Sequence, residues 1–146
     1  SEMCIRDRAM FNTLARKKLA VFGFSFKANT GDTRDSPAIY ICKRLLEEKA
    51  YLRITDPQAL KNARNDLQDL ENLEFVEDPY KAAEGVHGIA LITDWEEYCK
   101  LDFQKIFDKM EKPAFIFDGR NQLNRLALFD IGFNVYSVGK APLTHF

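Results

Sequence analysis

Polar side chains follow three of the apolar, strand-like runs of this sequence. They are Lys27 to Arg34 after residues 19–24, Thr93 to Trp95 after residues 88–93, and Asp118 to Arg120 after residues 114–117. Lysine and arginine form charge-assisted hydrogen bonds with phosphates, and the planar fork of arginine also suits sugar hydroxyls. The pattern therefore indicates a site for a phosphate-bearing ligand where these segments meet.

The first of these loops brings Lys27 and Arg34 close to the start of a helix that Ser36 caps. Free backbone N–H groups at the start of a helix favour an anion, so the two cations would assist phosphate binding there. From spacing alone, an equally open alternative is that both cations pair with Asp32 and Asp35 on the surface.

The same loop lacks the Gly-x-Gly-x-x-Gly spacing of a dinucleotide-binding turn. Gly23 stands alone, and Phe24 and Phe26 occupy positions where the close approach of a pyrophosphate favours glycine. We therefore expect this loop to be a poor NAD site in its own right.

Arg120 follows the tight Asp118-Gly119 turn, which should direct its guanidinium into the same cleft. The alternative is a local Arg120–Asp118 pair, which is preferred when spacing is the only guide. We interpret His87 and His145 as incidental. The sequence contains no paired carboxylates, no metal-ligand set and no Ser/His/Asp grouping.

Apolar runs and helical patterns alternate along the chain. Strands are predicted at 19–24, 51–55, 73–76, 88–93, 114–117 and 133–138. Helices are predicted from Ser36 to about Lys49, from Asp78 through Ala83, after Asp102 and from about Gln122 to Ile131, with residues 58–72 as a variable helix or loop. This alternation indicates an α/β fold, a doubly wound Rossmann-like parallel sheet of about six strands with helices on both faces. Ligands bind such sheets beyond the carboxyl ends of the strands, where the polar segments lie.

Composition excludes several function classes. The 146 residues are 46% apolar with a net charge of −1, which suits one domain with a sizeable core and leaves no basic excess for nucleic acid. No apolar run is long enough to span a membrane. Three cysteines without paired spacing indicate a reducing compartment, and we interpret Cys42, Cys99 and Trp95 as core or structural residues.

Residues 1–9 are expected to be a non-native leader. The string SEMCIRDR has no signal-peptide layout and resembles a translated sequencing adapter. A short native helix extension is the alternative. The folded domain is therefore expected to comprise residues 10–146.

Several motifs together resemble the C-terminal, UDP-binding domain of the UDP-glucose 6-dehydrogenases, in their plant-like eukaryotic branch. The resemblance runs from about Met10 to Lys140. Its motifs are Gly23–Lys27 with Thr30–Ser36, Lys112–Asn121, and Ile131–Phe133 with Tyr136–Lys140.

The resemblance implies roles for individual residues. Phe26, Lys27 and Arg120 correspond to residues that contact the UDP-sugar, and Arg34 corresponds to a residue that reaches NAD bound by the other domain. Ala28-Asn29 replaces the usual Lys-Asp, which changes local charge and leaves the substrate-contacting positions intact.

The family's NAD-binding glycine loop, catalytic cysteine motif and central helix are absent from this sequence, so no catalytic residue is assigned and the chain alone is expected to be inactive. The resemblance implies a cytoplasmic, homo-oligomeric parent enzyme that oxidises UDP-glucose to UDP-glucuronate with two NAD. The alternatives are a stand-alone nucleotide-binding or assembly module without turnover, or the C-terminal domain of another nucleotide-sugar dehydrogenase.

Overall fold

The computed structural model describes residues 14–146, and the leader predicted at residues 1–9 lies outside this range. The strands are β1 (Lys18–Phe22), β2 (Tyr51–Thr55), β3 (Leu73–Phe75), β4 (Gly88–Leu91), β5 (Phe115–Asp118) and β6 (Asn134–Ser137). The helices are α2 (Pro37–Glu47), α3 (Leu60–Asp66), α4 (Pro79–Ala82), α5 (Glu96–Cys99), α6 (Phe103–Asp108) and α7 (Arg125–Ile131).

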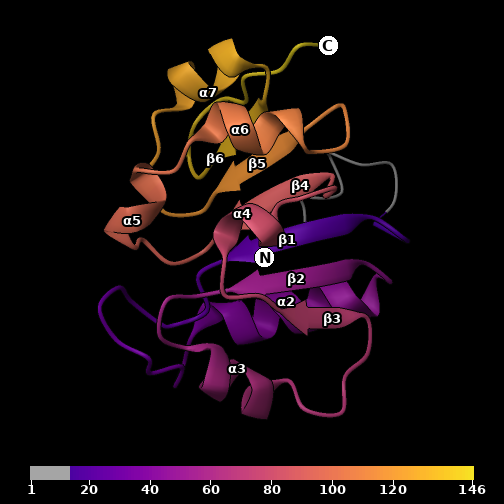
Figure 1. Cartoon of the computed structure of the whole chain (residues 1–146), viewed down its shortest axis with the longest axis vertical. Coiled ribbons are helices and arrows are strands. Elements are labelled where there is room, and N and C mark those ends of the chain that lie inside the picture. Colours follow the sequence, from indigo (N-terminus) through magenta and orange to yellow (C-terminus); the bar gives the residue numbers. More distant parts are fainter. Residues whose placement is uncertain (1–13) are drawn as a thin grey trace.

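The strands form one parallel sheet in the order β3-β2-β1-β4-β5-β6 (Figure 1). This is the order of a doubly wound Rossmann sheet, so the predicted fold class is confirmed. The chain reverses direction across the sheet between β1 and β4. That position is the topological switch point, where ligands of such sheets bind.

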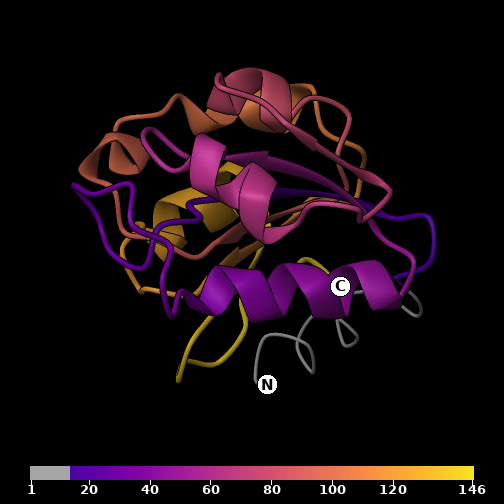
Figure 2. The same cartoon turned by 90° about the horizontal axis from the view of Figure 1, so that it is seen from below.

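Helices cover both faces of the sheet (Figure 2). A hydrophobic core lies under each layer of helices. Leu19 and Val21 of β1 pack with residues of α2 and α3. Ala20 and Phe22 of the same strand pack on the other side with residues of α4 to α7. Because successive strand residues face opposite sides, a strand buried on both faces needs a continuous apolar run. This requirement explains why the strands were recognisable in the sequence.

The register aligns the carboxyl ends of the central strands. Phe22 of β1 pairs with Thr55 of β2 on one side and Leu91 of β4 on the other, and Leu91 pairs with Asp118 of β5. The loops that follow these four strands therefore leave the sheet side by side from one edge.

Several element boundaries differ from the predictions. β1 ends at Phe22 and not at residue 24, because Gly23 adopts a φ of 97° and turns the chain away from the strand direction. β4 likewise ends at Leu91, two residues early. The last helix begins at Arg125 because Asn124 caps it, accepting from the backbone N–H of Ala127. The ends predicted for the other strands and helices lie within a few residues of those observed.

The sequence pattern did not clearly predict two of the helices, α3 and α5. α5 is a single turn without a side-chain cap, so it offers no periodic pattern to recognise. α3 occupies the middle of residues 58–72, which the sequence left open between helix and loop.

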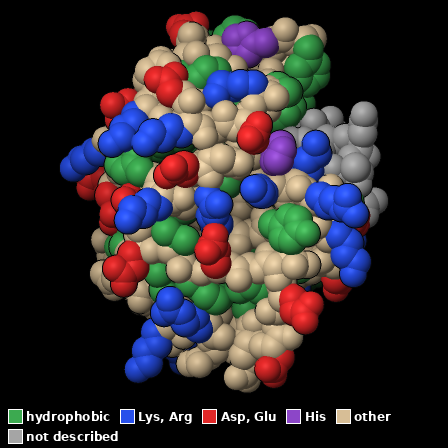
Figure 3. All heavy atoms as spheres, turned by 45° about the vertical axis from the view of Figure 1, so that its right-hand side comes forward, with side chains coloured by type: hydrophobic (Ala, Val, Ile, Leu, Met, Phe, Trp, Pro, Cys, Tyr) green, Lys and Arg blue, Asp and Glu red, His purple; other side chains and the backbone are tan. Residues whose placement is uncertain are grey.

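No helix within residues 14–146 has the length and apolar character that crossing a bilayer requires. Figure 3 shows one face of the molecule, on which acidic and basic side chains are interspersed.

Candidate functional site

The loop after β1 is fixed to the sheet edge by side chains from three other segments. Its anchor is the buried carboxylate of Asp56, which directly follows β2. Oδ2 accepts from the backbone N–H groups of Phe24 (2.7 Å) and Ser25 (3.0 Å), and from the Ser25 hydroxyl (3.1 Å). Oδ1 accepts from the backbone N–H groups of Gln58 and Ala59, both at 2.8 Å. One carboxylate therefore joins the loops that follow β1 and β2.

The segment after β4 holds the same loop from the other side. The Thr93 hydroxyl donates to the carbonyl of Ser25 at 2.7 Å. The indole N–H of Trp95 lies 3.2 Å from the Ser25 hydroxyl oxygen and 3.3 Å from Asp56 Oδ2. Trp95 is buried, as the sequence predicted, and it also carries this polar link. The loops of β1, β2 and β4 thus share one hydrogen-bonded cluster.

Phe26 and Lys27 follow directly after this anchored segment. Phe26 is 36% exposed although it is a large apolar residue. Lys27 Nζ lies 5.4 Å from the centroid of the Phe26 ring, within cation–π range. The two residues offer an aromatic surface and a positive charge in solvent, a combination suited to an anionic ligand with an apolar part.

Arg34 forms a local ion pair with Asp32, which is one of the two alternatives that the sequence left open. Its guanidinium contacts Asp32, with Nη2 2.6 Å from Oδ2, and no Arg34–Asp35 ion pair is found among the described residues. The hydrogen bonds from Arg34 lower the pKa of the Asp32 carboxyl to about 2. Its side chain is 88% exposed, so it remains open to a further partner.

Arg120 does not pair with Asp118. The Asp118 carboxylate is buried and accepts from the backbone N–H groups of Arg120 (3.0 Å) and Leu123 (2.7 Å), which shape the turn after β5. The Arg120 guanidinium instead lies 3.5 Å from Asp94 Oδ2, and both side chains are more than one-third exposed. The prediction of an Arg120–Asp118 pair was therefore wrong, because the Asp118 carboxylate accepts hydrogen bonds from backbone N–H groups of its own turn.

The segment after β4 links the two cationic loops. Thr93 bonds to the loop that carries Lys27, and the neighbouring Asp94 pairs with Arg120. All of these residues lie at the carboxyl edge predicted for them. Among the described residues, Lys27 and Arg120 form no direct contact with each other, and Arg34 pairs only with Asp32 as an ion pair.

The sequence analysis did not identify Asp56 as part of this cluster. Its position directly after a buried strand, at the same edge as the three polar segments, was the available signal.

In the described part of the chain, the cysteines and histidines contribute no reactive group to this edge. Cys42 is fully buried, as predicted, and burial raises the pKa of its thiol. Cys99, interpreted as structural, is exposed, and its thiol donates to the carbonyl of Gln122 at 3.8 Å; desolvation and nearby acidic groups raise its pKa. His87 accepts from the backbone N–H of Lys18, and His145 stacks on a phenylalanine ring. Within residues 14–146, no group of histidine, cysteine and acidic residues is arranged to hold a metal.

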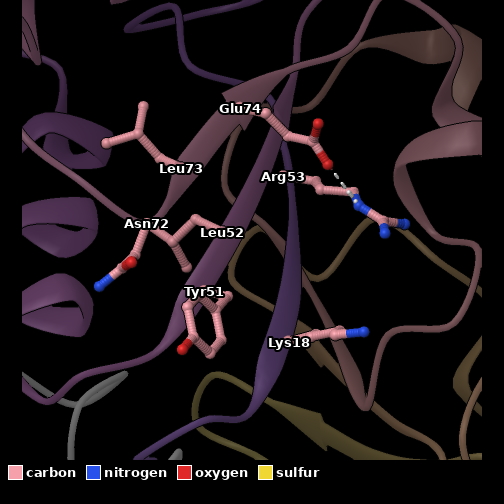
Figure 4. Close-up of a pocket in the computed structure, with 7 residues that line it drawn as sticks. All are labelled: Lys18, Tyr51, Leu52, Arg53, Asn72, Leu73 and Glu74. Atoms are coloured by element: carbon pink, nitrogen blue, oxygen red, sulfur yellow. Dashed lines mark hydrogen bonds and ion pairs between the residues drawn. The ribbon is translucent and has the colours of Figure 1, made fainter.

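A separate pocket of about 280 Å³ lies at the opposite edge of the sheet, where β1, β2 and β3 begin (Figure 4). Lys18, Tyr51 and Leu73 line it from these three strands. Arg53 and Glu74 also line it, and Arg53 Nε donates to Glu74 Oε1 at 2.8 Å. It is at the far ends of the strands from Lys27 and Arg120.

Residues 20–125 match the model of the UDP-glucose/GDP-mannose dehydrogenase family, UDP binding domain. The chain is 47% identical to UDP-glucose 6-dehydrogenase 1 of Arabidopsis thaliana, covering 90% of this chain and 32% of that enzyme. It is 48% identical to UDP-glucose 6-dehydrogenase of Caenorhabditis elegans, covering 91% and 29% respectively. A UDP-glucose dehydrogenase from Pyrobaculum islandicum superposes with a TM-score of 0.72 at 28% identity, covering 89% of this chain and 27% of that one.

The chain thus spans about a third of the length of the curated relatives it matches. The family model covers most of the sheet and the three loops that meet at its carboxyl edge. By this match and by its fold, the chain belongs to the UDP-glucose/GDP-mannose dehydrogenase family, as its UDP-binding domain.

Proposed function

We propose that residues 10–146 are the C-terminal, UDP-sugar-binding domain of a UDP-glucose 6-dehydrogenase. The observation that carries this proposal is the family match over residues 20–125, which includes both cationic loops of the carboxyl edge. In the complete enzyme, UDP-glucose would be oxidised to UDP-glucuronate while two NAD are reduced.

In this proposal, Phe26, Lys27 and Arg120 contact the UDP-sugar. Lys27 and Arg120 neutralise the negative charge of the diphosphate, and the exposed Phe26 ring packs against an apolar face of the ligand. Two observations support these roles: the solvent exposure of Phe26 and the location of both cations at the carboxyl edge of the sheet, Lys27 after β1 and Arg120 after β5. Arg120 would exchange its contact with Asp94 for the ligand when the ligand binds.

NAD supplies the hydride acceptor of this chemistry, and we place its main site outside this chain. In a dinucleotide-binding turn, backbone N–H groups after the first strand face the pyrophosphate. Here the N–H groups of Phe24 and Ser25 donate to Asp56, so they are not available to a cofactor phosphate. The exposed Arg34 is the residue we propose to reach NAD from this domain.

The test is a pair of measurements on the 146-residue chain. Calorimetric titration should detect binding of UDP and of UDP-glucose. Incubation with UDP-glucose and NAD should produce no NADH absorbance, because the chain holds no cysteine in the family's catalytic motif. A steady, protein-dependent rise in NADH, or no binding of either uridine nucleotide, would refute the proposal.

A further inference from the structure

The buried carboxylate of Asp56 has no catalytic use in the proposed function, yet it accepts hydrogen bonds from the loops that follow β1, β2 and β4. We propose that Asp56 is a positioning residue, which preorganises the Phe26–Lys27 segment for the UDP-sugar. This proposal rests on the function proposed above.

All partners of Asp56 are donors. They are the backbone N–H groups of Phe24, Ser25, Gln58 and Ala59, the Ser25 hydroxyl and the Trp95 indole N–H. An ionised carboxylate only accepts hydrogen bonds, with about four lone-pair sites on its two oxygens, and the Trp95 indole N–H is shared between Oδ2 and the Ser25 hydroxyl oxygen. An asparagine in this place would direct an NH₂ group at one of the two donor sets. The site therefore requires a carboxylate and not merely a polar side chain of the same shape.

The anchored atoms directly precede the segment that carries the binding side chains. Asp56 binds the N–H groups of Phe24 and Ser25. Their carbonyls accept from the hydroxyls of Ser36 and Thr93, each at 2.7 Å. Every backbone polar group of these two residues thus has a side-chain partner from another segment. The chain leaves this fixed dipeptide at Phe26, so the position of Phe26 and Lys27 depends on it.

Preorganisation has a direct effect on affinity. If the loop is ordered before the ligand arrives, binding does not have to supply the free energy of ordering it. Loss of the Asp56 carboxylate should free the Phe24–Ser25 backbone, so that Lys27 samples positions away from the ligand. We therefore expect weaker UDP-glucose binding although Asp56 itself does not touch the ligand.

The chain offers its own reporter for this cluster. Trp95 is its only tryptophan, and the indole N–H lies within hydrogen-bond distance of both Ser25 Oγ and Asp56 Oδ2. A change in the cluster should alter the tryptophan emission spectrum without any added label.

The experiment compares Asp56→Asn with Asn134→Ala in the 146-residue chain. Asn134 is the matched control because it is also a buried polar residue, and it starts β6 at the opposite edge. Its side chain accepts from the backbone N–H of His145 and donates to the carbonyl of Ala114. UDP-glucose affinity is measured by calorimetry, and stability and tryptophan emission are recorded for each variant.

We expect both variants to have a lower melting temperature. Only Asp56→Asn should shift the tryptophan emission and weaken UDP-glucose binding, by about tenfold. If folded Asp56→Asn binds like the unsubstituted chain, or if Asn134→Ala loses as much affinity, the positioning role is refuted.

A second variant decides the matter if Asp56→Asn does not fold. Ser25→Ala removes the hydroxyl that bridges Asp56 and Trp95 and keeps the backbone contacts. A loss of affinity in folded Ser25→Ala would support the proposal, and unchanged affinity together with a shifted tryptophan emission, which shows that the cluster is disturbed, would overturn it. If the unsubstituted chain does not bind UDP-glucose, the proposed function fails and the positioning role fails with it. Binding by the unsubstituted chain together with unchanged variants refutes the positioning role alone.

Discussion

Replacement of Arg120 by alanine should separate ligand binding from protein stability. The guanidinium makes one ion pair, with Asp94 at 3.5 Å, and the two side chains are 37% and 41% exposed. Pairs this accessible to water contribute about 0–1 kcal/mol to folding. Asp118 shapes the turn through backbone N–H groups, which the substitution leaves in place. The free energy of unfolding should therefore fall by less than about 1 kcal/mol.

The effect on UDP-glucose binding should be much larger. A hydrogen bond from a charged donor to a phosphate contributes about 1.5–3 kcal/mol, which corresponds to roughly a 10- to 150-fold change in the dissociation constant. In the unsubstituted chain, Arg120 has to give up its contact with Asp94 in order to bind the ligand, and the variant does not bear this cost. We therefore expect the loss to lie toward the lower part of this range.

The assay is calorimetric titration of UDP-glucose into the 146-residue chain, with urea unfolding of the same preparations. Arg44→Ala is the matched control, because Arg44 is 39% exposed and pairs with Glu47 on α2, outside the carboxyl-edge loops. Both substitutions remove one positive charge, so a difference in affinity reports position and not net charge. Equal dissociation constants for the two variants would refute the assignment of Arg120 to the ligand.

Three further predictions concern residues of the loop after β1. Gly23→Ala should lower the free energy of unfolding by more than about 2 kcal/mol in urea titration, because an added Cβ would lie 2.4 Å from Thr93 Cβ at a φ of 97°; a neutral substitution would contradict this geometry. In the complete enzyme, Arg34→Ala should raise the Michaelis constant for NAD selectively, whereas equal losses for both ligands with a lower melting temperature would indicate a purely structural role. An NMR titration should place the pKa of Asp32 at about 2, and in Arg34→Ala near its ordinary 3.8. Because the folded-state pKa is lowered, the stabilisation from this pair is present above about pH 4 and is lost as the pH falls toward 2, and an Asp32 midpoint unaffected by Arg34→Ala would exclude the pair as its cause.

The fold was predictable because its determinants are local. Strands buried on both faces read as continuous apolar runs, and Ser36, Asp78 and Asp102 cap α2, α4 and α6 as their sequence positions indicated. Two buried strands separated by a helical segment tend to become parallel, so the edge at which the polar loops gather followed as well.

The partners of the site residues were not predictable, because they come from other segments. Arg120 has an acidic residue two positions away, yet it pairs with Asp94, which lies 26 positions earlier in the sequence. The sequence could not show that the turn after β5 would use the Asp118 carboxylate for its own N–H groups. Asp56 likewise lies more than 30 residues from Phe24 and Ser25, and only the pairing of β1 with β2 brings them together.

Asp56 also explains why this Rossmann-like sheet would recognise phosphate through side chains. The turn after the first strand of such a sheet normally presents backbone N–H groups to the phosphates of a dinucleotide, and glycine allows the close approach. In this chain the protein's own carboxylate accepts from the N–H groups of Phe24 and Ser25. A ligand phosphate would have to displace a buried anion to reach them, and the two negative charges would repel each other. Under the proposed function, phosphate recognition at this edge would therefore fall to the exposed cations Lys27 and Arg120, while the backbone that a dinucleotide would use holds the loop in place.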